Sequence, residues 1–549
     1  MGQQLMHPAA SVRRRGAGLR QTMAGLHIWV GLLFGWLLYA MFMTGSVSFF
    51  RSEITQWMHP EVPFTQHVGD NGDVASKVVG TLTTLAPGSP QWSIDLPDAR
   101  DANAHASWRG GQVDGQVQPD GKAIFDPATG QAMSVRDTWG GEFFYYFHFT
   151  LHYLPSPLGR WIVGLAGMAL LVALVSGVII HKKIFANFFT FRPRKGQVSW
   201  LDAHNAFSVL GLPFHFMIAY TGLVALMTLY VPWGSNMVFD TARDRQTFMA
   251  QLHASMPTQI PSGQIAPLAD VGNMVRQAET RWGAGHIARV VVNNAGDATA
   301  RVMVVRGETD RVSVSPQYLL FDGASGTLLQ ASEPVGIAAE LRSVFYALHL
   351  GRFADVVTRF LYFIVSLAGT AMVGTGLVLW AVKRRSRAEV VARPNAGSTG
   401  SPSTRPDTQS VARSRMTATK PAPLGLRLVE RLNIAGIGGL SIAMTAFLWG
   451  NRLLPVSMAQ RAAWEIHLFF IVWALALGHA MLRPLAKAWF EQWSTAAVLL
   501  ALLPVLNALT SERNLIASIR SGDWVFAGVD LTVLALAGMH AVLAVGSRR

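Results

Sequence analysis

The sequence predicts a polytopic α-helical membrane protein with about eight transmembrane helices, in which two α+β domains are inserted in a duplicated four-helix core. Half of the 549 residues are hydrophobic and only 14% are charged, whereas soluble domains have about 25% charged residues. Several apolar stretches reach the length of about 20 residues that a helix needs to cross a bilayer. Two long polar segments between the early stretches share a short motif, which indicates an internal duplication.

The composition excludes several classes of function. The chain has no cysteine, so disulfides, thiolate zinc sites, iron–sulfur clusters and covalently attached haem are excluded. Any metal or redox chemistry must therefore use histidine, methionine or carboxylate side chains. The net charge of +14 comes from Lys and Arg clusters beside the apolar stretches, which is typical of membrane topology and not of nucleic-acid binding.

Eight apolar stretches are expected to cross the membrane, the first as a retained anchor because it is too long for the apolar core of a signal peptide. Lys and Arg clusters flank these stretches on one side only. We therefore expect a membrane protein with both termini in the cytoplasm and the two polar domains on the outer side of the membrane. The stretches lie at roughly 27–50, 157–180, 205–231, 356–382, 430–450, 464–482, 492–510 and 523–546.

The spans define the order of segments along the chain. Residues 384–423 are rich in Pro, Ser and Thr and have few large apolar side chains, so they cannot bury a core. The expected segments are a basic cytoplasmic N-terminus (1–26), the first helix (27–50), the first polar domain (51–150), the second and third helices with a basic loop at 181–200 (151–232), the second polar domain (233–348), the fourth helix (349–383), a disordered cytoplasmic linker (384–423) and a further four-helix domain (424–549).

An internal repeat relates the two polar domains. "AIFDPATGQAM" at 123–133 matches "YLLFDGASGTLL" at 318–329, and both are typical of a hairpin with a Gly-containing turn. Phe125 and Phe321 in these motifs are 196 residues apart. The same offset carries His152 to one residue before His349, so we expect these two histidines to be repeat equivalents.

The repeat predicts two pairs of facing histidines. His27 and His204 stand where the first and third spans leave the cytoplasm. Because parallel repeats are related by an axis along the membrane normal, His27 is expected to face His204 at the inner level, and His152 to face His349 at the outer level. Two facing imidazoles at each of two depths are what two bis-histidine haem b groups require as iron ligands.

Several histidines compete with this assignment. A single histidine at a membrane lip is more often an interfacial side chain than a ligand. His148 is an alternative to His152, because the two lie one helical turn apart on the same face. His215, about 16 Å deeper than His204 along a helix, is an alternative outer ligand or a neighbouring polar residue. His181 is expected to contact headgroups, or to replace an inner ligand.

The last four spans have ionisable residues of their own. His479 and His540 lie at similar depth and could bind a third haem, although ordinary helix-packing contacts are an alternative. His467 has no evident partner. Glu465 and Asp530, near the outer ends of their spans, are candidates for a quinol site or a proton path, because ionisable residues within a membrane are often functional.

The motifs "LHIWVGL", "FDPATG", "LHYLPSPLGRWIVGLAG", "WLDAHN" and "ALHLGRF" resemble those of the PepSY-associated transmembrane family, the iron-regulated membrane proteins that include ferric-siderophore reductases of Gram-negative bacteria. The resemblance covers about 20–383. It implies two periplasmic PepSY-type domains and haem in the four-helix core, with His27 and His204 as inner ligands and His152 and His349 as outer ligands. Residues 424–549 are absent from the minimal family pattern.

We therefore expect an oxidoreductase that passes electrons through two haems to a ferric siderophore in the periplasm, releasing Fe(II) for iron uptake. Electrons would come from a cytoplasmic reductase or from membrane quinol, and periplasmic iron-uptake proteins are possible partners. The "AGIGGL" at 435–440 follows no strand, so it does not indicate a nucleotide site. Trp139, Phe143, Tyr145 and Tyr146 are expected at the floor of a chelate cleft or in an interfacial belt.

Two alternatives come from other classes. One is a haem-free PepSY protein that binds or regulates a periplasmic peptidase or a chelate. The other is a siderophore permease. Secondary transporters commonly contain helices broken by Gly or Pro, and we expect the first four spans to be unbroken, which argues against transport.

Overall fold

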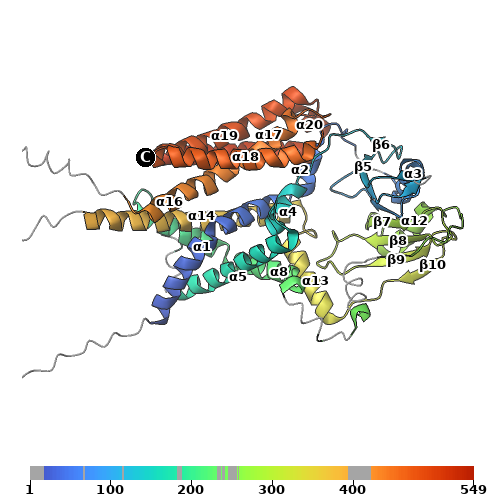
Figure 1. The fold of residues 1–549 in the computed structure, drawn as a ribbon, viewed down its shortest axis with the longest axis horizontal. Helices are drawn as coiled ribbons and strands as arrows, with labels where there is room; N and C mark the ends of the chain where they lie inside the picture. Colours follow the sequence, from blue (N-terminus) through green and yellow to red (C-terminus); the bar gives the residue numbers. More distant parts are fainter. Residues whose placement is uncertain are drawn as a thin grey trace, which may run out of the picture.

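The computed structural model describes residues 18–65, 69–113, 116–181, 188, 190–230, 237, 241–244, 256, 259–392 and 422–548. A helical part forms one end of the molecule and a sheet domain the other (Figure 1). Within the described residues, seven helices are long and apolar enough to cross a membrane, and one further pair of helices passes the same test together. The chain is therefore a multi-pass helical membrane protein, as the sequence predicts.

The four-helix core is formed by α1 (Leu19–Ser48), α5 (Ser156–Ile180), α14 (Val356–Ala392) and the pair α7 (Gln197–Leu210) and α8 (Leu212–Ala225). In this core α1 packs against α5 and α14, and α14 packs against α7. Short helices precede the second and fourth spans: α4 (Glu142–Thr150) packs against α1, and α13 (Ile337–Leu350) packs against α8.

The third span is not continuous, which corrects the expectation of unbroken helices. The axes of α7 and α8 differ by 67°, and Gly211 lies between them. Pro213 near the start of α8 cannot donate a main-chain hydrogen bond and its ring clashes with the preceding turn. A Cβ atom at Gly211 would lie 2.6 Å from the ring of His215, so the bend brings that ring against the break.

The two polar segments form one antiparallel sheet of eight strands instead of two separate domains. Its order is β10-β9-β8-β7-β1-β2-β5-β6. The strands are β1 (Gln91–Asp95), β2 (Ala104–Trp108), β5 (Gly121–Phe125), β6 (Ala132–Met133), β7 (Ile287–Asn293), β8 (Arg301–Arg306), β9 (Tyr318–Asp322) and β10 (Leu328–Ala331), and β3 (Gln112–Val113) with β4 (Gln116–Val117) makes a small separate ribbon.

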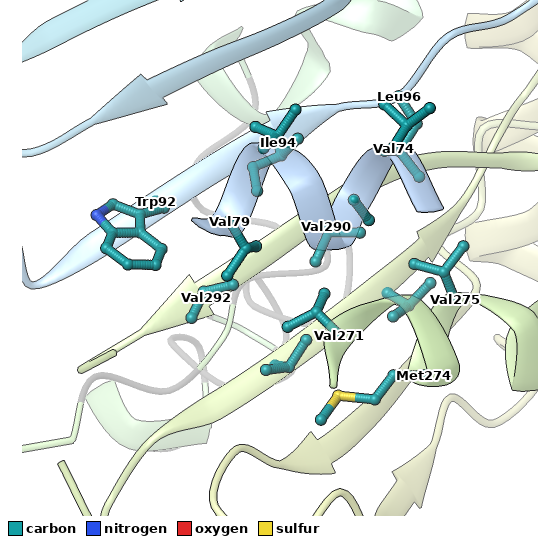
Figure 2. Packing of buried hydrophobic residues seen from close by; sticks show 14 of the residues in the cluster. Val74, Val79, Trp92, Ile94, Leu96, Val271, Met274, Val275, Val290 and Val292 are labelled. Carbon is teal, nitrogen blue, oxygen red and sulfur yellow. The ribbon is translucent and has the colours of Figure 1, made fainter. Parts of the chain in front are cut away.

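The two repeat units meet at the centre of the sheet, where β1 of the first unit pairs with β7 of the second. Ile94 in β1 pairs with Val290 in β7, and these residues are 196 residues apart, the offset that relates the two hairpin motifs. Each unit places one helix on the same face of the sheet, α3 (Asn71–Leu85) and α12 (Val271–Trp282). Their apolar residues and those of the central strands form one core (Figure 2). The two units therefore share a single hydrophobic core.

The last part of the chain is a second helical bundle. It comprises α16 (Leu424–Ile434), a π-helical turn (Ala435–Gly439), α17 (Leu440–Leu453), α18 (Arg461–Leu482), α19 (Leu485–Thr510), the short α20 (Leu515–Ser521) and α21 (Trp524–Ser547). The "AGIGGL" segment is thus part of a membrane helix. The first residues of the expected linker are helical, because α14 continues to Ala392. Residues 393–421 lie outside the described part, as do residues 1–17, 182–187 and 189 of the basic segments.

The shared core predicts that a cavity at the centre of the sheet weakens both units. Ile94 is fully buried, so Ile94→Ala should destabilise the sheet domain by about 2–5 kcal/mol. The measurement is thermal unfolding of the detergent-purified protein with limited proteolysis in both units. Leu328→Ala, at an exposed site on edge strand β10, is the control and should change stability by less than about 0.5 kcal/mol. Proteolysis confined to the first unit would contradict a shared core.

Candidate functional site

Two pairs of histidine rings face each other in the four-helix core. The inner pair is His27 on α1 and His204 on α7, with ring centroids 6.2 Å apart and planes at 70°. The outer pair, at the end nearest the sheet domain, is His148 on α4 and His349 on α13, with centroids 6.1 Å apart and planes at 30°. Each pair joins one half of the duplicated core to the other.

This spacing fits one metal ion between two imidazoles. Two metal–nitrogen bonds of about 2 Å, together with the short distance from each nitrogen to its ring centre, give roughly 6 Å between ring centroids. Among the described residues, no group of three or more His, Asp or Glu side chains could hold an ion by itself. Two axial imidazoles suffice when a porphyrin supplies the remaining ligands, so the residues present fit haem.

The second nitrogen of each ring fixes its tautomer. In all four rings Nδ1 lies within hydrogen-bond distance of a main-chain oxygen of another helix. Since a carbonyl oxygen only accepts, Nδ1 must donate, and Nε2 keeps its lone pair for a metal. The acceptors are the oxygens of Ala173 for His27 (2.9 Å), Met372 for His204 (2.8 Å), Met41 for His148 (2.7 Å) and Ile218 for His349 (3.0 Å).

Each histidine ring packs against a Ser/Thr-Gly dipeptide of the neighbouring helix. The glycine lies four residues after the accepting carbonyl, and a Cβ atom there would lie 2.8 to 3.4 Å from the ring. The preceding hydroxyl bonds within its own helix, and at two positions it also approaches Nδ1. The dipeptides are Thr44-Gly45 on α1 for His148, Ser176-Gly177 on α5 for His27, Thr221-Gly222 on α8 for His349 and Thr375-Gly376 on α14 for His204.

The structure corrects one predicted pairing: His148, and not His152, faces His349. In the first unit the histidine lies 16 positions after the first residue of the last strand (Ala132 to His148), and in the second unit it lies 21 positions after it (Leu328 to His349). A constant offset therefore points to the wrong ring. The Ser/Thr-Gly dipeptide in each core span is the sequence signal that we missed.

His152 lies outside the pairs, in an aromatic cluster at the start of the second span. Its ring packs edge-on against Trp139 and Phe143 and stacks on Phe470 of α18. The neighbouring Tyr153 hydroxyl is hydrogen-bonded to Nδ1 of His467, so His467 has a partner that the sequence did not reveal.

The other alternative ligands occupy separate positions. His215 is fully buried beside Phe42 on α1, its Nδ1 has no hydrogen-bond partner among the described residues, and it faces no second histidine there. His181 directly follows α5. Neither belongs to the two facing pairs.

The structure does not bring His479 and His540 together as a facing pair. Nε2 of His479 lies 2.8 Å from Glu491, which occupies the nitrogen that would bind iron. His540 packs against Trp493 at 5.3 Å between ring centroids, and its Nδ1 donates to the Leu536 oxygen of its own helix. The two rings make contacts with other residues and not with each other, so helix packing accounts for both.

Glu465 and Asp530 are parts of a buried polar network. Glu465 accepts hydrogen bonds from Thr138, Asn451 and Arg461. Asp530 accepts from the indole of Trp57 on α2 (Arg51–Met58) and from Asn507. Because buried carboxylates need such partners, these contacts give both residues a structural role in joining the C-terminal bundle to the core.

A cavity of about 560 Å³ connects the outer pair to the sheet domain. His148 and His349 line its inner part, whereas Asp101, His105 and other polar residues of the sheet domain line the opposite part. Of the four aromatic residues expected at its floor, Tyr145 lines the cavity, and Trp139, Phe143 and Tyr146 belong to the aromatic packing around His152. The outer pair is therefore accessible to a small molecule in the cavity.

Comparisons with known proteins agree with the extent of this core. The sequence profile of the PepSY-associated TM region matches residues 24–383, which include all four paired histidines. The chain is also similar to an uncharacterized protein of Pseudomonas aeruginosa, with 24% identity over 398 residues that cover 68% of this chain and 87% of the relative.

The glycine at each ring yields a prediction. A Cβ atom at Gly45 would lie 2.8 Å from Cε1 and Nδ1 of His148, so Gly45→Ala should displace the ring while the helix is kept. We expect haem affinity at the outer pair to fall about 10- to 100-fold, measured by haem titration of the purified protein. Gly31→Ala on the same helix is the control, because no atom lies within 4 Å of the new Cβ. Equal losses of haem affinity in both variants would contradict the role of Gly45 in seating the His148 ring.

Proposed function

The chain belongs to the PepSY-associated transmembrane family, and from that premise we propose that it is a membrane electron conduit that binds two haem b groups and reduces a ferric siderophore. The observation that carries the proposal is the presence of two facing histidine pairs in which Nδ1 donates to a carbonyl, so that the lone pair of each ring is on Nε2. His27 with His204 would hold one haem, and His148 with His349 would hold the other. A bound haem would supply one-electron transfer between Fe(III) and Fe(II).

The positions of the two pairs support transfer across the membrane. His27 and Gly45, which contacts His148, are 18 residues apart on the continuous helix α1. At 1.5 Å per residue this separates the two levels by about 27 Å along the helix, close to the thickness of the apolar part of a bilayer. The chain therefore offers one ligand pair near each membrane surface.

The cavity supports a small acceptor at the outer pair. A ferric siderophore held there would receive one electron per Fe(III), and oxygen ligands bind the resulting, less charged Fe(II) more weakly. The distribution of Lys and Arg supports an inner-membrane location with this cavity on the periplasmic side. The released Fe(II) would serve iron acquisition.

The electron donor is proposed to be separate from the chain. "AGIGGL", the glycine-rich segment considered in the sequence, forms a π-helical turn within a membrane helix, which does not suit a dinucleotide. A cytoplasmic reductase or membrane quinol would deliver electrons to the inner pair.

The bend between α7 and α8 favours one alternative, a siderophore permease, because broken helices are common at transporter sites. However, both halves of the bent span take part in the histidine sites: α7 holds His204, and α8 provides the Ile218 carbonyl and Gly222 for His349. The bend is thus accounted for by the conduit. A permease or a haem-free regulatory protein would not require this arrangement.

The test is the visible spectrum of the detergent-purified protein, oxidised and dithionite-reduced, with haem quantified as the pyridine haemochrome. We expect a sharp reduced α-band and about two haems per chain. His204→Ala and His349→Ala should each remove about one haem, and the electron flow from a reduced donor to ferric siderophore should be lost with either.

A matched pair of variants separates the outer ligand from its neighbour. His148→Ala should lose the outer haem, whereas His152→Ala should retain it, because His152 lies in the aromatic cluster. A protein that stays colourless after expression with added haem would rule out the conduit.

A further inference from the structure

Two arginines lie in the cavity beside the outer histidine pair. Arg51 begins α2, and Arg352 follows α13 by two residues. Both line the cavity together with His148 and His349. Tyr145 and Tyr346, each three residues before one of these histidines and thus about one turn toward the sheet domain, line it as well. These two guanidinium and two phenol groups lie nearest the outer pair along the chain. The rest of the cavity lining carries charges of both signs, from Arg100, Arg289, Arg306, Asp95, Asp98, Asp101 and Glu308.

The two arginines are close enough to repel each other. Burial, and next the positive charge of Arg352, hold the pKa of Arg51 below its ordinary value. Burial is the largest single effect on Arg352 and lowers its pKa, but Glu308, Tyr145 and Tyr346 together outweigh it and the net shift is upward. Like charges placed together in a partly buried site are unfavourable unless an anion lies near them.

The carboxylates of the protein satisfy these arginines only in part. Arg51 contacts Glu142 at 3.2 Å and lies over the ring of Tyr145 at 4.4 Å, and Glu142 does not line the cavity. Arg352 contacts Glu308 at 3.0 Å through one nitrogen. A guanidinium group has five N–H donors, so both side chains keep donors for a ligand in the cavity.

We propose that Arg51 and Arg352 form a clamp that binds a pair of carboxylate groups directly above the outer histidine pair. Arginine suits this role because its planar fork binds a carboxylate through two parallel hydrogen bonds. This inference rests on the proposed function for the source of the carboxylates. They belong either to the propionates of the outer haem or to an anionic ferric chelate in the cavity, and the shared chemistry is a dicarboxylate.

The first experiment removes the clamp. Arg51→Gln, Arg352→Gln and the double variant are compared with Arg301→Gln, which removes an arginine paired with Asp322 in the sheet, away from the cavity. Haem per chain, the midpoint potential of the outer haem and the KM for ferric citrate are measured in each. Arg51→Lys with Arg352→Lys keeps the charge but loses the fork, and separates a binding defect from misfolding.

The two sources give different results. If the clamp holds propionates, the double variant loses outer haem and its remaining outer haem has a lower potential, because positive charge near the iron favours the reduced form. Haem dimethyl ester would then bind equally to wild-type and variant apoprotein. If the clamp holds the chelate, haem content stays unchanged and the KM for ferric citrate rises by about tenfold or more, as expected for loss of a bidentate charged contact.

Other outcomes overturn the clamp. Haem content, potential and KM that all match those of Arg301→Gln would exclude it. If the wild-type protein binds no haem, the proposed function fails separately, and calorimetric titration of the colourless protein with citrate then tests the clamp: binding that is lost in the double variant supports it, and no binding to the wild type overturns it.

Discussion

The hydrogen bond between a histidine Nδ1 and a main-chain carbonyl of the neighbouring helix occurs four times, and the packing of the four-helix core depends on it. Each carbonyl already accepts the N–H four residues later in its own helix, so the imidazole uses the second lone pair of the oxygen. The side chain at that later position would cover the oxygen. Glycine at 45, 177, 222 and 376 removes this obstacle and lets the ring approach the backbone. The helices that carry the histidines and the helices that carry these glycines must therefore pack closely and in one register.

Much of this arrangement could be predicted from the sequence, because it depends on local patterns. Apolar length predicts the spans, and the paired motifs around Phe125 and Phe321 predict the last hairpins of the sheet. The pairing of His27 with His204 follows from their places at the starts of the first and third spans. The structure brings these rings together as expected.

The errors concern features that local patterns do not encode. The pairing of β1 with β7 joins segments almost two hundred residues apart, and no pattern in either strand indicates it. A constant offset favours His152 over His148 because it assumes repeat units of equal length, but the two units differ in length between the last strand and the histidine. The bend before Pro213 was missed because the residues on both sides are apolar enough for one continuous helix. His479 and His540 share a depth, but depth does not determine which way a side chain points.

The C-terminal bundle contributes to the outer site from a distance. Phe143 and Phe147 of α4 pack against Phe447 and Phe469 of the bundle. Hydrogen bonds to Glu465 and Asp530 connect the segment before α4 to α18 and α2 to α21 of the same bundle. Since α4 holds His148, the bundle restricts the movement of that ring. These buried charges would be costly without their partners, so the contact between bundle and core is specific.

The continuous sheet has a further consequence. A transporter with two related halves works by rocking one half against the other, but here the strands β1 and β7 join the halves in one ladder over a common core. Electrons need no such movement. In the proposed conduit, a frame that holds both halves fixed would keep the surroundings of each haem nearly the same before and after an electron arrives, which would lower the reorganisation energy of the transfer. Rigidity between the halves would then itself be a kinetic advantage.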